Sequence, residues 1–267
     1  MLFHCDKYLS LKYNFAYFIY FLLLYLCIGD VIELIRNFLL LIILFSFSII
    51  QAQAQQTVFN VPSADVTPKG HLFLQQESQF NGSNPGAFFN GTTYSAVGIG
   101  HNTEIDATLF NVGAPATQNM SIGVGFKSTV PIPGLKEKFP EREFKFTIGS
   151  DILFGLEGNG VGNWSYAHLS GRVPKVNTRL TAGVSYGTRQ VFGQETTAFI
   201  AAVEQPITKK FSLIGDWYSG NEHWAGYLIT GFSYAFPKNT TLYCGYQIPN
   251  SPQVGNNGFV IELAKIF

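Results

Sequence analysis

Past Asn60, apolar and polar residues alternate along nearly the whole chain, with a period of two rather than 3.6. In the stretch MSIGVGFKSTV, residues 120–130, one face carries Ile122, Val124 and Phe126, while the opposite face carries small residues and Lys127. The stretch FKFTIGSDILF, residues 144–154, repeats this scheme. A period of two predicts β-strands whose two faces meet different surroundings.

The character of the two faces indicates what those surroundings are. The apolar face is long, aromatic and continuous, whereas the opposite face mixes small residues with charged ones. A soluble sandwich needs the reverse, because its packed interior is apolar. The sequence therefore predicts an all-β protein, an antiparallel transmembrane β-barrel with lipid outside and a polar lumen. A soluble β-protein with ordinary hairpins is the alternative.

The alternation divides into about 12 strands, an even number, as bacterial barrels have when both ends face the periplasm. Four connections, HNTE at 101, PKVNTR at 174, PITKKF at 206 and PKNTTL at 237, lie about two strands apart and suit tight turns at one edge. The charged segment 131–143 is expected at the same edge as a solvated loop. The strands are expected to begin near His71, Thr92, Glu104, Met120, Phe144, Asn163, Thr178, Thr196, Phe211, Trp224, Thr240 and Gly258.

Composition agrees with a membrane protein and excludes one class of partner. Only 13% of the 267 residues are charged and 15% are aromatic, which leaves few charges for a soluble surface. Lysine plus arginine and aspartate plus glutamate number 17 each, so there is no basic field to attract nucleic acid. Beyond the first 54 residues Cys244 is the sole cysteine, which rules out an internal disulfide there.

The start of the chain is a hydrophobic leader with two apolar runs. Residues 31–54 are predicted to be a secretory signal peptide, since Ala52-Gln53-Ala54 forms an A-x-A site after the second run. Residues 1–30 are interpreted as a mispredicted extension, with a membrane helix over 14–29 as the alternative. Residues 55–70 have no clean period and are expected to be a periplasmic tail or a segment in the lumen. The barrel is assigned to residues 71–267.

The chain closes with NGFVIELAKIF, an alternating stretch that ends on an aromatic residue. This ending resembles the C-terminal signature of bacterial outer-membrane β-barrel proteins, in which the last residue is Phe and apolar residues alternate backward from it. The matching positions are Phe259, Ile261, Leu263 and Phe267, whereas Lys265 departs from the pattern. The resemblance implies an outer-membrane location in a Gram-negative bacterium, contact with outer-membrane lipid, and recognition by the barrel-insertion machinery. It identifies a general class and no subfamily.

Charged residues on the polar faces of the strands are the candidate functional residues. Inside a barrel such charges either line a water-filled path or pair across a closed lumen. The predicted lumen-lining polar residues are Glu77, Glu104, Asp106, Lys127, Lys145, Asp151, Arg172, Arg179, Arg189, Glu204, Asp216 and Glu262. Seven aromatic residues near strand ends, Trp164, Trp217, Trp224, Tyr186, Phe232, Tyr234 and Phe236, are candidates for the interfacial girdles.

The expected function is passive passage of small solutes through the lumen, without covalent chemistry and without a cofactor. A mainly structural barrel is the first alternative. A lipid hydrolase is the second, because His168 and Ser170 point to the same face of one strand, in a His-x-Ser stretch similar to that of outer-membrane phospholipase A and lipid A deacylase. Gly171 departs from the asparagine of those families. The histidines are scattered without ligand spacing, so no metal site is expected.

Overall fold

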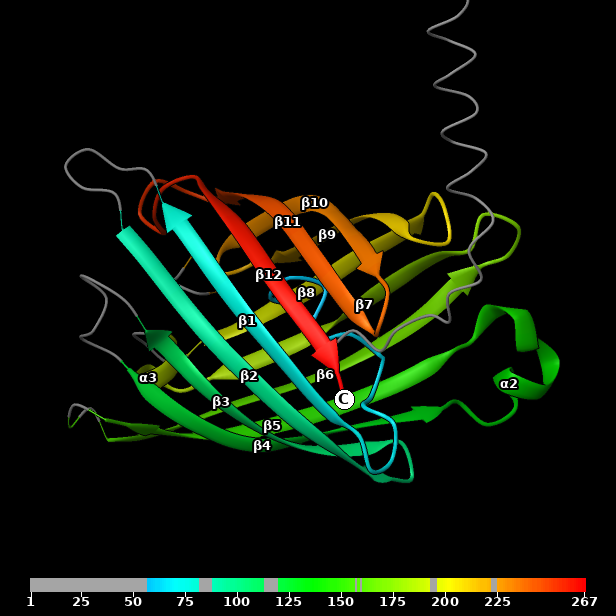
Figure 1. Ribbon diagram of the computed structural model, residues 1–267. Helices are drawn as coiled ribbons and strands as arrows, with labels where there is room; N and C mark the ends of the chain where they lie inside the picture. The colour runs from blue at the N-terminus through cyan, green and yellow to red at the C-terminus, as the bar shows by residue number, and fades with distance from the viewer. Residues whose placement is uncertain are drawn as a thin grey trace, which may run out of the picture. The chain divides into compact units, whose positions relative to one another are not determined.

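The computed structural model describes residues 57–81, 88–112, 120–156, 158, 160–192, 196–221 and 225–267. These form a closed antiparallel barrel in which each strand pairs with its neighbours along the chain and β1 pairs with β12 (Figure 1). The strands are β1 (Leu72–Asn81), β2 (Phe88–Gly100), β3 (Thr103–Val112), β4 (Ser121–Pro131), β5 (Lys145–Gly155), β6 (Val161–Val173), β7 (Thr178–Gly187), β8 (Thr196–Pro206), β9 (Phe211–Tyr218), β10 (Tyr227–Phe236), β11 (Thr240–Pro249) and β12 (Gly258–Ile266). The predicted fold class and strand number are thus confirmed.

Among the described residues, three short helical turns lie in connections between strands. The helix α2 (Leu135–Lys138) and the 3₁₀ turn η2 (Pro140–Arg142) are in the connection between β4 and β5, and α3 (Arg189–Phe192) follows β7. No helix among the described residues is long and apolar enough to cross a membrane. The predicted signal peptide and the leader before it fall outside the described residues.

Most strands begin within one or two residues of their predicted starts. The largest difference is β2, which begins at Phe88 rather than near Thr92. Asn90 and Gly91 interrupt the apolar alternation of the sequence, yet the residues FFNG continue the ladder with β1, where Asn90 lies opposite Gln79. The predicted start near Trp224 falls outside the described residues.

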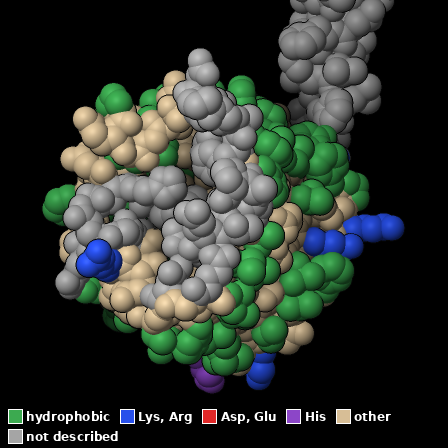
Figure 2. Space-filling model, turned by 90° about the vertical axis from the view of Figure 1, so that its left-hand side faces the viewer, with side chains coloured by type: hydrophobic (Ala, Val, Ile, Leu, Met, Phe, Trp, Pro, Cys, Tyr) green, Lys and Arg blue, Asp and Glu red, His purple; other side chains and the backbone are tan. Residues whose placement is uncertain are grey.

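The outer surface of the barrel is apolar. Alternate residues of the strands expose large hydrophobic side chains, among them Ile105, Phe199 and Phe259, which are 54%, 69% and 61% exposed. Figure 2, which views the barrel from the edge where β1 ends and β2 begins, shows hydrophobic side chains around its circumference. Water would not favour such a surface, whereas lipid would. The apolar strand face predicted to lie outside does so.

The two edges of the barrel differ in their connections. At one edge, here called the turn edge, β2–β3, β6–β7, β8–β9 and β10–β11 are joined by residues 101–102, 174–177, 207–210 and 237–239. Residues such as His101, Asn177 and Asn239 have a positive φ there, which tight turns require. The segment 132–144 joins β4 to β5 at the same edge. The opposite edge, here called the loop edge, carries α3, the end of β1 and the start of β2.

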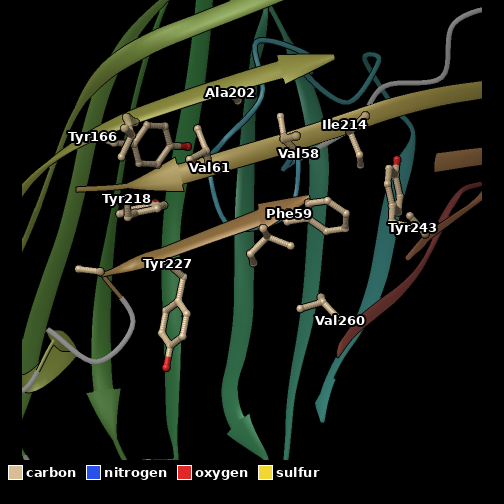
Figure 3. Packing of buried hydrophobic residues seen from close by; sticks show 14 of the residues in the cluster. Val58, Phe59, Val61, Tyr166, Ala202, Ile214, Tyr218, Tyr227, Tyr243 and Val260 are labelled. Atoms are coloured by element: carbon tan, nitrogen blue, oxygen red, sulfur yellow. The ribbon is translucent and has the colours of Figure 1, made fainter. Parts of the chain in front are cut away.

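Residues 57–67 lie inside the barrel and are here called the inner segment. Val58, Phe59 and Val61 are fully buried and belong to one apolar cluster with inward side chains of the strands, including Tyr243 and Val260 (Figure 3). The segment makes a tight loop in which the Val58 amide donates to the Val61 carbonyl at 2.8 Å. It then leaves toward the turn edge, where the Gly70 amide donates to the Gly98 carbonyl at 2.8 Å, and β1 begins.

Candidate functional site: the barrel interior

The first contact that holds the inner segment is with Asp216 on β9. Asp216 faces inward. Leu213 and Trp217, whose side chains point the opposite way along β9, are exposed on the outer face. Its Oδ2 atom accepts three backbone hydrogen bonds, from the amides of Phe59, Asn60 and Val61, at 2.9, 2.7 and 2.6 Å. These amides belong to an irregular loop and would otherwise be buried without a partner. One carboxylate oxygen therefore holds the tip of the segment.

The second contact is an ion-pair group around Asp65. Its Oδ2 atom accepts from Arg179 Nη1 at 2.7 Å, and its Oδ1 atom lies 3.7 Å from Lys145 Nζ. Arg179 also lies 3.4 Å from Glu204 Oε1. Burial alone would raise the pKa of Asp65, but the charge of Arg179, its hydrogen bond and the charge of Lys145 outweigh burial and lower that pKa. Asp65 is thus held in its charged form between two basic side chains.

The third contact is on β3, nearer the turn edge. The amide of Thr67 donates to Glu104 Oε2 at 2.7 Å, and Lys127 Nζ lies 3.2 Å from the other oxygen of Glu104. The side chains of Lys127 and Glu104 are buried. Each charge therefore has an opposite charge close by, which buried ions need.

Two glycines of the wall make room for the inner segment. A Cβ atom at Gly98 on β2 would collide with the backbone oxygens of Thr67 and Pro68. A Cβ atom at Gly245 on β11 would come within 2.6 Å of Phe59 Cζ. Any larger residue at either position would displace the segment or the strand. The wall is therefore shaped to accept the segment as well as to bind it.

A cavity of about 150 Å³ lies between the inner segment and the loop edge. Its floor is formed by Thr57, Phe59 and Asn60 of the inner segment. The strand residues around it include Gln75, Glu77 and Gln79 of β1, Thr92 and Tyr94 of β2, Thr108, Phe110 and Asn111 of β3, Ser121 of β4, Leu153 of β5, Trp164 of β6 and Tyr218 of β9, with Gln190 and Val191 of α3. On the other side of the segment, inward side chains such as Lys127, Thr147 and His168 are at most 2% exposed, so the described interior is filled there.

The predicted lumen residues fall into distinct groups in this structure. Lys127, Lys145, Arg172 and Arg179 each have an acidic partner; the Arg172 Nε atom lies 2.8 Å from Glu143 Oε2 at the turn edge. Arg189 lies in α3 and is exposed, so it is not part of the strand wall. The acidic members on inward faces are Glu77, Glu104, Asp106, Asp151, Glu204, Asp216 and Glu262.

Two further carboxylates meet across Gly125. Asp106 on β3 and Asp151 on β5 both lie opposite Gly125 of β4 in the ladder, and a Cβ atom at that glycine would collide with the Asp151 carboxylate. Glu77 and Glu262 are directly opposite each other on β1 and β12. Amide side chains contact this second pair, because Gln79 Nε2 donates to Glu77 at 2.5 Å and Gln75 Nε2 donates to Glu262 at 2.8 Å. Neither glutamate has a basic side chain within ion-pair distance among the described residues.

The hydrolase alternative needs a histidine that contacts the serine hydroxyl. His168 and Ser170 do lie on one inward face of β6 and are 2% and 4% exposed. Both ring nitrogens of His168 lack a hydrogen-bond partner in the part of the chain that the structure describes, and the ring stacks on Tyr166 at a centroid distance of 6.2 Å. The arrangement therefore does not place a general base on Ser170.

One predicted girdle residue is inside the barrel. Trp164 points inward, where its indole N–H donates to Ser185 Oγ at 2.8 Å and its ring borders the cavity. The prediction for Trp164 was wrong because its strand neighbour Asn163 is polar yet faces outward, where it contacts Ser150 and Ser165 instead of the lumen. Trp217, Phe232 and Phe236 are exposed on the outer face, and Trp224 is outside the described residues.

The residues of the predicted C-terminal assembly signal lie on the outer face. Phe259, Ile261, Leu263 and Phe267 are between 44% and 61% exposed. Lys265, which departs from the signature, places its Nζ atom 4.7 Å from the centre of the Phe267 ring, a cation–π contact. Recognition of this ending by insertion machinery stays a prediction.

Sequence reasoning missed the residues of the inner segment and the amides of β1. Asp65 was not among the candidates, because the segment has no period from which its position could be inferred. Gln75 and Gln79 carried a usable signal, since they alternate with Glu77 on one face of β1, but only charged residues were selected. No group of three or more His, Cys, Asp or Glu side chains among the described residues is arranged to hold a metal ion.

Comparisons with known proteins found similar solved structures. The sequence matches no protein-family model, and no curated protein sequence matches it. Among solved structures, the KdgM porin aligns over 74% of this chain and 99% of its own, with 9% identity and a TM-score of 0.49. An outer membrane channel from Pseudomonas putida F1 aligns over 78% and 100%, with 9% identity and a TM-score of 0.44, and outer membrane protein Omp33 of Acinetobacter baumannii over 74% and 98%, with 10% identity and a TM-score of 0.43. At these identities and TM-scores the likeness does not carry over to function.

Proposed function

We propose that this chain is an outer-membrane barrel for passive passage of small solutes, and that the inner segment closes its lumen in the state seen here. The observation that carries the proposal is the closed strand ladder with an apolar outer face and a polar interior, which holds a cavity on one side of the inner segment. The polar interior is what a water-filled path needs. Passage of this kind requires no covalent step.

The location follows from the same features. A closed barrel leaves no unpaired edge in lipid, and an apolar exterior suits the hydrocarbon layer. The turn edge, with its tight connections, would face the periplasm, and the loop edge would face outward. The exposed apolar residues Phe259, Ile261 and Leu263 on the outer face of β12 support recognition by the barrel-insertion machinery.

The inner segment is the feature that passage must overcome. It occupies the lumen with its apolar residues buried and with polar contacts that include those at Asp216, Asp65 and Glu104. Solutes larger than water would pass only when the segment moves. A mainly structural barrel is the second candidate, and the filled interior is the observation that favours it.

Single-channel conductance in a planar bilayer distinguishes the two candidates. The wild-type protein should show rare or low conductance, while a variant lacking residues 57–67 should show steady openings, because the lumen loses its central obstruction. Folding of both proteins is checked by their heat-modifiable mobility on gels. If both are folded and both stay silent, the pore is excluded and the structural role stands. Equal conductance of the two proteins would show that the inner segment does not close the lumen.

A further inference from the structure

Positive charge is concentrated at the turn edge of the barrel. Fourteen Lys and Arg residues fall in the described part of the chain, and ten of them lie at this edge. Of the other four, Lys127, Lys145 and Arg179 are paired with carboxylates in the lumen, and Arg189 lies in α3 at the loop edge. The whole chain has no net charge, so the two edges differ through the distribution of charge and not through composition.

Acidic side chains do not balance the cations of the turn edge. Among the described residues, the acidic side chains outside the lumen are Glu137, Glu141 and Glu143, and all three lie in the segment 132–144. Glu143 is already paired with Arg172, whose Nε atom lies 2.8 Å away. At the other turns and strand ends of this edge, six lysines have no acidic side chain of the described residues within ion-pair distance. These are Lys69, Lys175, Lys209, Lys210, Lys238 and Lys265.

The six lysines are spread over the strands from β6 through β12 to β1. Lys175 lies in the turn between β6 and β7, Lys238 lies in the turn between β10 and β11, and Lys69 precedes β1. A compact anionic partner would reach only the lysines of one or two neighbouring turns. A partner that forms a charged layer around the barrel reaches all of them at once, and the headgroup region of a bilayer is such a layer.

Exposed apolar side chains lie directly beside these lysines. Ile207 is 55% exposed and precedes Lys209 by two residues, and Phe236 is 40% exposed and precedes Lys238 by two residues. The lysines therefore follow the end of the apolar band that covers the outer face. A lysine at such a border keeps its apolar stem near the hydrocarbon and extends its ammonium group to the headgroups. The border of the apolar band thus points to lipid rather than to a soluble polyanion.

We propose that these six lysines form a binding surface for anionic phospholipid headgroups in the leaflet that the turn edge meets. The phosphodiester group of an anionic lipid such as phosphatidylglycerol accepts charge-assisted hydrogen bonds from lysine ammonium groups. The headgroup of phosphatidylcholine has the same phosphodiester, but its own choline cation offsets the charge, so the surface prefers the anionic lipid. The proposal rests on the proposed function only in that the barrel spans a bilayer, and it does not depend on passage of solutes.

Electron paramagnetic resonance of spin-labelled lipids tests the proposal on the full chain in phosphatidylcholine vesicles. Lipids that contact the barrel give a motionally restricted component, and its fraction gives the association constant of labelled phosphatidylglycerol relative to labelled phosphatidylcholine. We expect a preference for phosphatidylglycerol of about threefold or more at 0.1 M salt. The preference should fall by at least half at 1 M salt, because the screening length decreases from about 10 Å to about 3 Å. Equal association of the two lipids, or a preference that salt does not change, would overturn the proposal.

A triple variant assigns the preference to the lysines of the turns. Replacing Lys175, Lys209 and Lys238 with Gln removes one cation from each of three turns. We expect the preference for phosphatidylglycerol to fall at least twofold, while the fraction of restricted phosphatidylcholine stays unchanged. An unchanged preference would overturn the assignment.

A matched control removes the same amount of charge from the same edge. Lys136, Lys138 and Arg142 are exposed in the segment 132–144, where the acidic side chains of this edge also lie. Replacing these three with Gln should leave most of the preference in place. An equal loss in the control and in the turn variant would mean that only net charge matters, and it would overturn the assignment to the six lysines.

The outcomes separate this proposal from the proposed function. A preference for phosphatidylglycerol together with a silent variant lacking residues 57–67 would retain the lipid surface and exclude the pore. Steady conductance without a lipid preference would retain the pore and overturn the lipid surface. Absence of a restricted component for both lipids would show that the barrel does not contact a bilayer, and it would overturn both.

Discussion

At the scale of single residues, some carboxylates of the lumen accept hydrogen bonds from backbone amides of the inner segment. Asp216 accepts hydrogen bonds from three amides of one loop, and Glu104 accepts one more, from the amide of Thr67. A hydrogen bond to a charged acceptor contributes about 1.5–3 kcal/mol, roughly twice a neutral one. These carboxylates thus stabilise an irregular chain segment. Part of the charge in the lumen is structural rather than a lining for solutes.

The Asp65 carboxylate makes the position of the inner segment dependent on pH. Its pKa is lowered in the folded protein by Arg179 and Lys145, against an unfolded value of about 3.9. The stabilising contribution of Asp65 is therefore fully present above that unfolded value and is lost as the pH falls through the lowered folded value. A nitroxide label at Val66→Cys, with the other cysteines replaced by serine, should be immobile at pH 7 and become mobile as the medium is made strongly acidic.

Asp65→Asn separates this contact from other acid effects. In the Asp65→Asn variant the label should already be mobile at pH 7, and its mobility should change less on acidification. Glu204 and the two basic partners of Asp65, Arg179 and Lys145, are unchanged in this variant. Electron paramagnetic resonance line shapes measure both proteins. Identical pH profiles would show that Asp65 does not hold the segment.

At the scale of elements, the inner segment and the strand wall fit each other as two packed surfaces. The segment contributes Val58, Phe59 and Val61 to the interior, while β11 leaves space for Phe59 by means of Gly245. Packed interiors tolerate little added volume, so a side chain at Gly245 should cost stability. The position of this element depends on packing and on polar contacts that include those with Asp216, Arg179 and Glu104.

A double-mutant cycle between Gly245 and Phe59 tests that fit. Gly245→Val should destabilise the protein because its side chain meets the Phe59 ring, and Phe59→Ala should destabilise it by leaving a cavity. In the double variant the new valine occupies part of that cavity. The double variant should therefore lose less free energy of unfolding than the two single variants together, with a coupling of about 0.5–3 kcal/mol. Urea unfolding in lipid vesicles gives the free energies. Strict additivity would mean that the two residues are not in contact.

The elements also show what could be predicted from sequence. Strand faces were predictable because residues such as Val124 and Lys127 alternate in step with the pleat, so their exposure in lipid or lumen follows from parity alone. The inward direction of Trp164 could not be predicted in this way, because its polar neighbour Asn163 faces outward. The Asn163 amide forms hydrogen bonds there with serine hydroxyls. The position of the inner segment could not be predicted from alternation, because it depends on contacts with Asp216, Arg179 and Glu104, each far away in sequence.

At the scale of the whole molecule, the barrel is a shell with apolar and polar sides reversed relative to a soluble protein. Its outward side chains contribute stability by leaving water for lipid, so the cost of a charge there should depend on depth. This depth dependence is a property of the closed barrel in a bilayer and not of any one contact. It separates a transmembrane barrel from the soluble alternative.

Two valines on the outer face provide a matched test of membrane depth. Val184 lies within β7, and Val173 lies at the end of β6 beside the turn edge; they are 43% and 41% exposed. Val184→Lys should lower the free energy of unfolding by about 2–4 kcal/mol and Val173→Lys by about 0–1 kcal/mol, as for lysines at the midplane and the interface. Unfolding from lipid vesicles measures both. Equal small losses would argue that this face does not meet lipid.

The pairing of β1 with β12 has a consequence for how the protein folds. The seam joins Phe73 to Ile266, so its formation brings together residues from nearly opposite ends of the described chain. Such non-local pairing is slow and comes late in folding. The inner segment ends four residues before β1 begins, so we expect it to enter the nascent barrel as the seam forms. Closure of the barrel and burial of the inner segment are therefore expected to occur together.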